Sequence, residues 1–273
     1  MNWIKHHRYL IARRIVQIAL IVLYLGAHLW GWKILQGTLG SSKFFQTIPL
    51  ADPFAIIQMV CAGALLATDL VIGGILIVTF YALVGGRAFC SWVCPVNIVT
   101  DTANGLRRLL RLEEVERKVW ISRNLRYWFL GLALIVSALT GIAAFEVISP
   151  IGILNRGLIF GIGFGGALIV GVFLFDLFGV KNGFCGHICP LGGFYSLISR
   201  FSLIRVKHNQ EKCTLCMKCT TICPEKPVLN MIGKRSEFVT MGECTNCARC
   251  IDVCDDDALY FDFRLRQFKQ GKE

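Results

Sequence analysis

The sequence predicts an all-α membrane bundle of four transmembrane helices in two parallel repeats, with a small α+β domain at its C-terminal end. Three observations support this fold class. The 273 residues have a mean hydropathy of +0.57 and 55% of them are hydrophobic, more than a soluble globular chain carries. A Cys-x3-Cys-Pro motif occurs twice, with 95 residues between equivalent cysteines. Eight of the thirteen cysteines lie within residues 213–254.

These features divide the chain into four predicted segments. They are a first membrane repeat at 1–100, a cytoplasmic basic linker at 101–126, a second membrane repeat at 127–205 and a cytoplasmic cysteine-rich domain at 206–273. Each repeat is expected to hold two transmembrane helices and one motif. The net charge of +11 does not indicate nucleic-acid binding, because Lys and Arg gather beside the apolar spans, where they orient the chain.

The first repeat begins with a basic leader. Residues 1–14 contain no acidic residue, and an apolar run from Ile15 to about Leu35 follows. This pattern predicts a transmembrane helix with a cytoplasmic N-terminus and no cleavable signal peptide. Residues 36–52 are polar and predict an outer loop. The leader carries Lys5, Arg8, Arg13 and Arg14.

The apolar region after Pro53 is too long for one simple span, and Thr68-Asp69 interrupts it with a good helix start. We therefore expect a short half-embedded segment at 54–66 and a second transmembrane helix at 68–86. The basic stretch at 100–126 is expected to be cytoplasmic. It is either an interfacial amphipathic helix or a solvated loop. Its basic residues are Arg107, Arg108, Arg111, Arg117, Lys118, Arg123 and Arg126.

The second repeat follows the same course. A third span is predicted at 127–148, with Glu146 near its outer end, and a fourth at 151–180, with Asp176 near its exit. Pro53 and Pro150 occupy matching outer positions, 97 residues apart. Four spans place both termini in the cytoplasm of a multi-pass protein of the bacterial inner membrane.

The C-terminal cysteines fall into two runs of one spacing, C-x2-C-x2-C-x3-C. This spacing is typical of bacterial ferredoxins with two [4Fe-4S] clusters, in which the fourth cysteine of each run binds the other cluster. The expected ligands are Cys213, Cys216, Cys219 and Cys254 for cluster 1, and Cys244, Cys247, Cys250 and Cys223 for cluster 2. Zinc is the alternative for CxxC pairs, but it does not explain two identical four-cysteine runs. A proline, Pro224, follows only the first run.

The two Cys-x3-Cys-Pro motifs are expected on one face of the membrane. A spacing of three places two sulfurs one helical turn apart, and two repeats would bring four thiols together at the cytoplasmic boundary. Three interpretations stay open for this cofactor-binding site: a third metal or iron–sulfur centre, a redox-active dithiol, or inert packing thiols. The four residues are Cys90, Cys94, Cys185 and Cys189.

Together these features resemble the NapH family, ferredoxin-type membrane subunits of periplasmic nitrate reductase systems. The likeness rests on the four spans, the run that ends at Pro224, and two motif sequences, FCSWVCP at 89–95 and CGHICP at 185–190. It implies a quinol dehydrogenase component that needs a partner subunit. The implied partners are a NapG-like periplasmic iron–sulfur protein and, beyond it, NapC or the nitrate reductase NapAB. The relatives NosR and CcoG suggest an alternative, a membrane redox or metal-handling assembly factor.

A quinol dehydrogenase needs proton acceptors near the ring oxygens of its substrate. Four polar residues lie at the predicted outer ends, His28, Asp52, Glu146 and Arg156. We select His28 and Glu146 as the catalytic quinol contacts; ordinary interface residues are the alternative interpretation. An apolar pocket between the two halves would hold the ring. A b-type haem is not expected, because His28 is the only histidine inside a predicted span.

Overall fold

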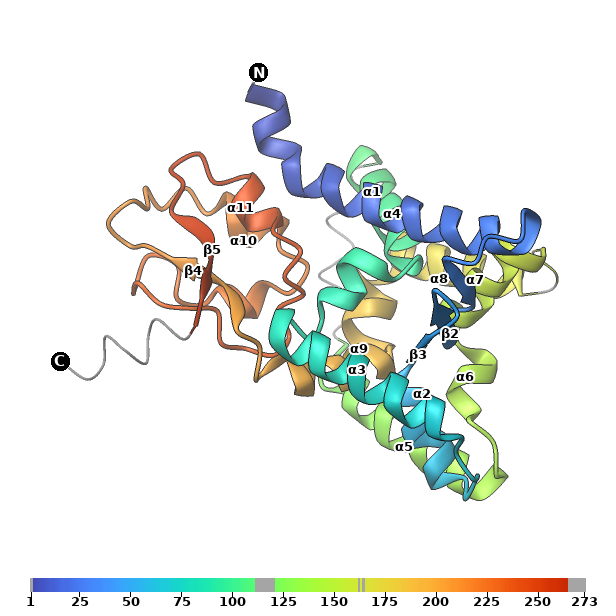
Figure 1. Ribbon diagram of the computed structural model, residues 1–273. Helices are drawn as coiled ribbons and strands as arrows, with labels where there is room; N and C mark the ends of the chain where they lie inside the picture. Colours follow the sequence, from blue (N-terminus) through green and yellow to red (C-terminus); the bar gives the residue numbers. More distant parts are fainter. Residues whose placement is uncertain (1, 111–120, 162, 164, 265–273) are drawn as a thin grey trace. The chain divides into compact units, whose positions relative to one another are not determined.

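The computed structural model describes residues 2–110, 121–161, 163 and 165–264 (Figure 1). The chain packs into two compact units. The C-terminal unit combines Met1–Val16, Phe80–Val93 and Tyr195–Glu273, and the helical unit combines Gln17–Thr79 and Cys94–Phe194. The first motif therefore divides between the units, with Cys90 in the C-terminal unit and Cys94 in the helical unit.

Helix α1, Asn2–Leu29, includes the basic leader that was predicted to precede it. It ends six residues before the predicted position, because Gly31 adopts a φ of +68° and the amides of Trp30 and Trp32 donate to the Gly26 carbonyl (3.0 and 3.2 Å). Its segment His6–Leu29 is long and apolar enough to cross a bilayer, with a mean hydropathy of 1.8.

The predicted outer loop contains a three-stranded antiparallel sheet that the sequence analysis missed. Its strands are β1 (Leu35–Gly37), β2 (Ser41–Phe44) and β3 (Ile48–Ala51), in the order β1-β2-β3. Leu35 pairs with Phe44, and Ser42 with Leu50. Leu35 also packs with Tyr24 and Ile159 in a small core, which fixes the sheet within the helical unit.

The two helices predicted after Pro53 are both present. Helix α2 spans Pro53–Cys61 and helix α3 spans Thr68–Val84. Pro53 occupies the first turn of α2, where its missing N–H costs nothing, and the Asp52 carboxylate accepts a hydrogen bond from the Phe54 amide (3.0 Å).

The third and fourth predicted spans are each broken. Helix α5 (Leu125–Thr140) ends at Gly141, whose φ of +69° stops it before α6 (Ala144–Ile148). Helix α7 (Pro150–Phe160) ends at Gly161, and α8 (Gly166–Leu174) continues into a π-helical turn, η3 (Phe175–Gly179). Ser149 caps α7 as Asp52 caps α2, so both halves contain a short proline-started helix followed by a second apolar helix.

Helix α4, Val96–Leu109, replaces the start of the predicted basic loop. Its Arg107 is 2% exposed and donates to the carbonyls of Asp176 (3.4 Å) and Gly179 (3.2 Å), so this charge is buried rather than solvated. The Asn104 amide donates to the Asn182 side chain (2.7 Å). Arg111, Arg117 and Lys118 lie outside the described residues, and the question of an amphipathic helix there stays open.

The C-terminal unit is built on a two-stranded antiparallel sheet, β4 (Ile204–His208) and β5 (Leu259–Phe263). Between the strands lie two short helices, α10 (Lys218–Ile222) and α11 (Arg249–Asp252), and a 3-10 turn, η5 (Lys226–Leu229). Their apolar side chains and several cysteines form one core. The domain boundaries predicted at 100, 126 and 205 stay predictions.

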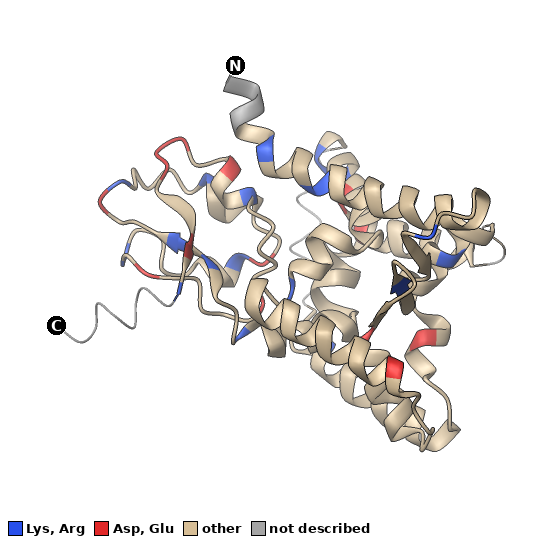
Figure 2. Ribbon diagram, viewed as in Figure 1, with Lys and Arg blue, Asp and Glu red and all other residues tan. Residues whose placement is uncertain are grey.

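Only α1 among the described helices is long and apolar enough to span a bilayer alone; α3, α5, α7 and the helix from Gly166 to Gly179 are apolar but shorter. Figure 2 shows long stretches without charge along α1, α3 and α5, and both signs of charge over the cysteine-rich part. The structure is mostly helical, and the four-span bundle stays a prediction.

Candidate functional site

The two cysteine loops, residues 213–219 and 244–250, have the same backbone conformation. Left-handed residues occur at matching positions, Leu215 and Met217 in the first loop (φ 62° and 58°) and Asn246 and Ala248 in the second (φ 48° and 57°). Alternation between left- and right-handed residues turns successive amides towards one concavity, a nest that binds anionic groups, including iron–sulfur clusters. Each loop of three cysteines therefore has a backbone suited to binding a negatively charged cluster.

The thiols of the second loop lie together with one thiol from the first run. A single cavity of the C-terminal unit is lined by Cys223, Cys244, Cys247 and Cys250. Burial raises the pKa of the Cys250 thiol well above its usual value, and charges at Cys247, Cys244 and Cys223 raise it further. The fourth cysteine of one run therefore lies beside the first three of the other.

The first loop shows the same arrangement, with the fourth cysteine of the second run beside the first three cysteines of the first run. Burial raises the pKa of the Cys219 thiol, and charges at Cys254, Cys213 and Cys216 contribute in the same direction. No disulfide joins the described cysteines. No three His, Cys, Asp or Glu side chains of the described residues lie close enough to hold a single metal ion directly.

The donor sets fit two [4Fe-4S] clusters in their chemistry. Each set contains four thiols and no other ligand type, and each is served by a nest of amides. Buried thiols must lose their protons when they bind iron, so cluster binding and folding are coupled in this unit.

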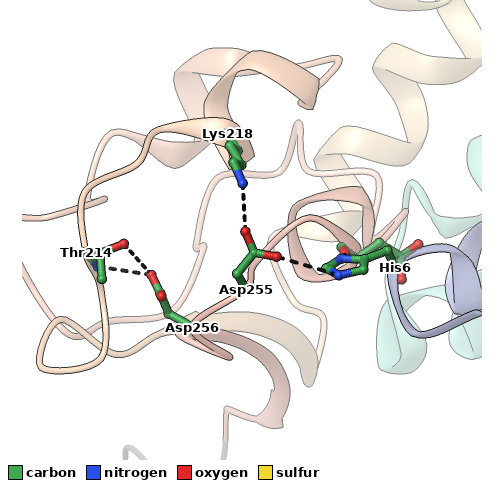
Figure 3. Close-up of polar contacts among 6 residues, drawn as sticks. His6, Thr214, Lys218, Asp255 and Asp256 are labelled. Atoms are coloured by element: carbon green, nitrogen blue, oxygen red, sulfur yellow. Dashed lines mark hydrogen bonds and ion pairs between the residues drawn. The ribbon is translucent and has the colours of Figure 1, made fainter. Parts of the chain in front are cut away.

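Asp255 stands where a proline would follow Cys254. Its carboxylate accepts from the Lys218 ammonium (2.7 Å) and lies 3.6 Å from the His6 ring, as Figure 3 shows. Next to it, Asp256 accepts from both the amide and the hydroxyl of Thr214 (3.1 and 2.6 Å). These contacts tie the end of the second run to the first loop and to α10.

A buried ion pair holds the second loop. The Arg87 guanidinium donates to the Glu225 carboxylate and to the Glu243 carbonyl, both at 2.8 Å, and both charged side chains are nearly fully buried. Arg205, which is fully buried, lies beside Cys244. Burial raises the pKa of the Cys244 thiol, and the Arg205 charge lowers it. Neither Arg87 nor Arg205 was selected from the sequence.

The first half of the first motif contacts the second cysteine loop. Residues Phe89–Val93 form a π-helical turn, η1. From it the Ser91 hydroxyl donates to the Thr245 carbonyl (2.8 Å) and the Trp92 indole to the Asn246 carbonyl (3.0 Å). Asn246 in turn donates to the carbonyls of Val84 (3.4 Å) and Ile204 (2.9 Å). Cys90 therefore belongs to the turn that packs on the loop of cluster 2.

The motifs are π turns and not α-helical turns. The second motif forms η4, Phe184–Ile188, and Cys189 after it is extended (φ −60°, ψ 111°), because the following proline disfavours the helical conformation. A helical turn was expected across each motif, and the turn is π-helical; the approach of the two sulfurs stays a prediction. Cys189 directly precedes α9, Pro190–Ser199, and its sulfur accepts from the Gly192 amide (3.4 Å). Convergence of the four thiols stays a prediction.

The two motifs share one pattern of burial. The second cysteine of each, Cys94 or Cys189, is 4% exposed, and the first, Cys90 or Cys185, is half-buried. His187, inside the second motif, is also buried; burial lowers the pKa of its ring, as do the charges of Arg123 and Arg126. This histidine was not selected from the sequence.

Three of the four polar residues proposed for quinol lie together in the helical unit. The Arg156 guanidinium donates to the Glu146 carbonyl (3.4 Å). Burial raises the pKa of Asp52 to about 7, the Phe54 hydrogen bond lowers it, and the charge of Glu146 adds to the rise. His28 packs edge-on against Phe160, with ring centroids 4.8 Å apart.

Comparisons with known proteins agree with this geometry. A model described as a 4Fe-4S binding domain matches residues 66–113 and again residues 161–208, a shift of 95 residues that equals the spacing of the motifs. A 4Fe-4S dicluster domain matches residues 205–255, which contain both cysteine loops. No solved structure matches the chain.

Curated relatives extend over nearly the whole chain. "Ferredoxin-type protein NapH" of Escherichia coli is 41% identical and covers 94% of this chain and 90% of its own length. NapH of Haemophilus influenzae is 40% identical, with 97% and 93% covered. "Methylamine utilization ferredoxin-type protein MauN" of Methylorubrum extorquens is 42% identical, with 96% and 92% covered. The chain therefore belongs to the NapH family of ferredoxin-type proteins, and it is an iron–sulfur electron-transfer protein.

Proposed function

We propose that this protein is a membrane subunit that oxidises quinol and passes the electrons through two [4Fe-4S] clusters towards a partner. Cys213, Cys216, Cys219 and Cys254 would hold cluster 1, and Cys244, Cys247, Cys250 and Cys223 would hold cluster 2. The observation that carries this proposal is the crossed grouping of the thiols within one unit of a chain that also has one long apolar helix and several shorter ones.

Exposed apolar side chains support insertion of more than α1 in the bilayer. Ile75 of α3 is 61% exposed, and Trp128 and Leu139 of α5 are 77% and 82% exposed. Water-soluble proteins rarely carry apolar surfaces of this kind without a partner or a membrane to cover them. The proposed multi-pass topology, with both termini in the cytoplasm of the inner membrane, gives these surfaces lipid neighbours.

Oxidation of a quinol to a quinone releases two protons and two electrons. The clusters, when bound, supply one-electron acceptors. Asp52 would take one proton, because a carboxyl with a pKa of about 7 exchanges protons readily at physiological pH, and the neighbouring Glu146 would take the other. His28 would orient the ring from its contact with Phe160.

The contacts of the first motif suggest an order for the electron carriers. Ser91 and Trp92 flank the second cysteine loop with two hydrogen bonds, so cluster 2 would exchange electrons with the centre or thiols of the Cys-x3-Cys-Pro motifs. A metal centre and a redox-active dithiol stay the two functional alternatives for Cys90, Cys94, Cys185 and Cys189.

Two destinations for the electrons follow from the relatives. In the NapH-like case, a NapG-like periplasmic iron–sulfur protein would receive them and pass them towards NapC or the nitrate reductase NapAB. The similarity to MauN, equal to that with NapH, favours methylamine utilization as a second candidate. The partner subunit decides between these cases, and the quinol reaction of this chain would be common to both.

Stopped-flow reduction of the anaerobic, cluster-loaded protein by decylubiquinol tests the proposal. We expect rapid bleaching of the clusters, with a rate that rises as the pH passes through about 7, where Asp52 loses its proton and becomes an acceptor beside Glu146 and Arg156. Asp52→Asn should remove this pH dependence. Glu146→Gln and His28→Ala should slow the reaction about tenfold or more, and undiminished rates would remove both residues from the mechanism.

If the protein is instead an assembly factor, the same stopped-flow experiment should give a different result. Dithionite-reduced clusters would be oxidised by added Cu²⁺ or Fe³⁺, and decylubiquinol would be inert. If the clusters are intact and the partner subunit is bound, and decylubiquinol still does not reduce the clusters, the dehydrogenase proposal is contradicted.

A further inference from the structure

A cavity of about 510 Å³ lies between α7 and α8 in the helical unit. Its apolar walls are Ile153, Leu154 and Phe160 of α7 and Ile169 and Val170 of α8, and several glycines belong to the same lining. The volume falls in the range of small-molecule sites. The cavity lies within the second repeat, whereas the sequence analysis expected a pocket between the two halves.

One charged side chain lines this apolar space. Arg156 projects from α7, and its guanidinium also contacts the Glu146 carbonyl at 3.4 Å. Arg156 Nη2 and Glu146 Oε1 lie 3.3 and 3.2 Å from the position that a Cβ on Gly152 would take, so this glycine leaves room for the two side chains to approach each other. Glu146 in turn interacts electrostatically with Asp52. A chain of polar groups thus leads away from the cavity wall.

The rest of the lining is apolar and partly accessible. Phe160 is 63% exposed and Val170 is 56% exposed. His28 packs against the edge of Phe160. A ligand for this site would therefore have a ring that packs against aliphatic and aromatic side chains, a polar atom for Arg156, and enough lipid solubility to arrive through an apolar opening.

We propose that this cavity binds the headgroup of a quinone or quinol, with the Arg156 guanidinium donating a hydrogen bond to a ring oxygen. The inference rests on the proposed function, since it locates the substrate site of that reaction. Neither His28 nor Glu146, the residues selected from the sequence, lines the cavity; each contacts one residue that does. An acyl chain alone would leave the charge of Arg156 without a ligand partner.

Glycines offer a matched pair of variants. Gly163 lines the cavity, and a Cβ there would have no heavy atom within 4 Å. We expect the ring of a tryptophan at this position to occupy part of the site. Gly171, in α8 but outside the cavity lining, has equally open surroundings. Gly163→Trp and Gly171→Trp therefore make the same chemical change inside and outside the proposed site.

Calorimetric titration of the full-length, cluster-loaded protein in nanodiscs with decylubiquinone or menadione measures binding without turnover. We expect the unmodified protein and Gly171→Trp to bind alike, Gly163→Trp to lose at least tenfold in affinity, and Arg156→Gln to lose about tenfold with partial recovery in Arg156→Lys. The two probes separate benzoquinone from naphthoquinone preference. Cluster absorbance checks that each variant is folded, and Arg156→Gln still tests the site if Gly163→Trp does not fold.

Equal binding by Gly163→Trp, Arg156→Gln and the unmodified protein would overturn the assignment. Displacement of decylubiquinone by an equal concentration of dodecylphosphocholine would also overturn it and identify a lipid groove. The proposed function fails separately: if decylubiquinone binds as expected but decylubiquinol never reduces the clusters, the site stands without the reaction. If Gly163→Trp is reduced as fast as the unmodified protein, the reaction stands without this site.

Discussion

The two cysteine loops have one spacing and one backbone conformation, yet their surroundings differ. In the first loop Leu215 and Met217 are 57% and 47% exposed, and Cys216 is exposed. In the second loop Asn246, Cys247 and Ala248 are buried. Residue spacing therefore determines how a cluster is ligated, while the side chains between the cysteines determine whether that cluster faces solvent or the interior.

The contacts that hold the loops differ in the same way. The Lys218–Asp255 pair beside cluster 1 is exposed to water, whereas the Arg87–Glu225 pair beside cluster 2 is buried. Exposed ion pairs contribute little to stability, and a buried pair is costly to break. We expect cluster 1 to be the centre that exchanges electrons with a separate partner, and cluster 2 to be the centre that serves this chain's own motif.

Loss of the buried Arg87–Glu225 ion pair should have the largest effect on the free energy of unfolding. Arg87→Leu leaves Glu225 charged and without its guanidinium partner in the interior, which should lower the free energy of unfolding by about 3–5 kcal/mol. Denaturation of the loaded protein, followed by cluster absorbance, measures the change. Lys218→Ala is the matched control and should have no measurable effect. Equal effects of the two variants would show that the two loops are held alike.

A reciprocal exchange at the matching left-handed position tests the difference between the loops directly. Asn246→Leu removes two part-buried hydrogen bonds to backbone carbonyls and places a branched side chain at positive φ, so we expect a loss of about 2–3 kcal/mol in the free energy of unfolding. Leu215→Asn places a residue that tolerates this conformation and should be neutral or stabilising by about 0.5 kcal/mol. Similar unfolding energies for both variants would contradict the comparison.

The buried charge of Arg205 should separate the reduction potentials of the clusters. A cation beside Cys244 favours the more negative, reduced state of cluster 2, so Arg205→Met should lower its potential by about 60 mV or more, a tenfold change in a one-electron equilibrium. Potentiometric titration followed by paramagnetic resonance resolves the two clusters. The potential of cluster 1 should stay constant, and Arg205→Lys should restore most of the shift. A shift of both potentials together would contradict the assignment.

Removal of the hydrogen bond donated by the Trp92 indole should have the smallest effect on the free energy of unfolding. Trp92→Phe keeps the ring but loses the donor to the Asn246 carbonyl, which should cost about 1 kcal/mol and broaden the resonance of cluster 2 alone. Trp128, which is 77% exposed on α5, gives the control Trp128→Phe. The prediction fails if the two variants unfold at the same denaturant concentration.

Much of the chemistry, and less of the architecture, could be predicted from the sequence. Cysteine spacing is a local signal, so the two runs indicated two clusters, and the repeat of 95 residues is matched by two copies of one family model. Capping is also local: Thr68-Asp69 was used to predict a helix start, and α3 begins at Thr68, while the Asp52-Pro53 pair starts α2. The same pair of signals, Ser149-Pro150, was present in the second half, and it could have predicted that α7 is a short helix as well.

Other features depend on contacts between distant residues. The pairing of Arg87 with Glu225 joins positions 138 residues apart, and nothing in the sequence near either residue indicates it. The fit of Asp255 to Lys218 and His6 likewise depends on the fold of the loops. The sheet at 35–51 was missed because its strands are only three or four residues long, too short for a period of alternating hydrophobicity to show.

Paramagnetic resonance of anaerobic Cys223→Ser and Cys254→Ser proteins, with iron and sulfide analysis, tests the crossed ligand sets most directly. The unmodified protein should contain about eight irons and eight acid-labile sulfides in its C-terminal domain. Cys223→Ser should reproduce the spectrum of Cys244→Ser, in which cluster 2 is altered, and Cys254→Ser should reproduce that of Cys213→Ser. If Cys223→Ser instead matches Cys213→Ser, or if the protein contains zinc without labile sulfide, the account is contradicted.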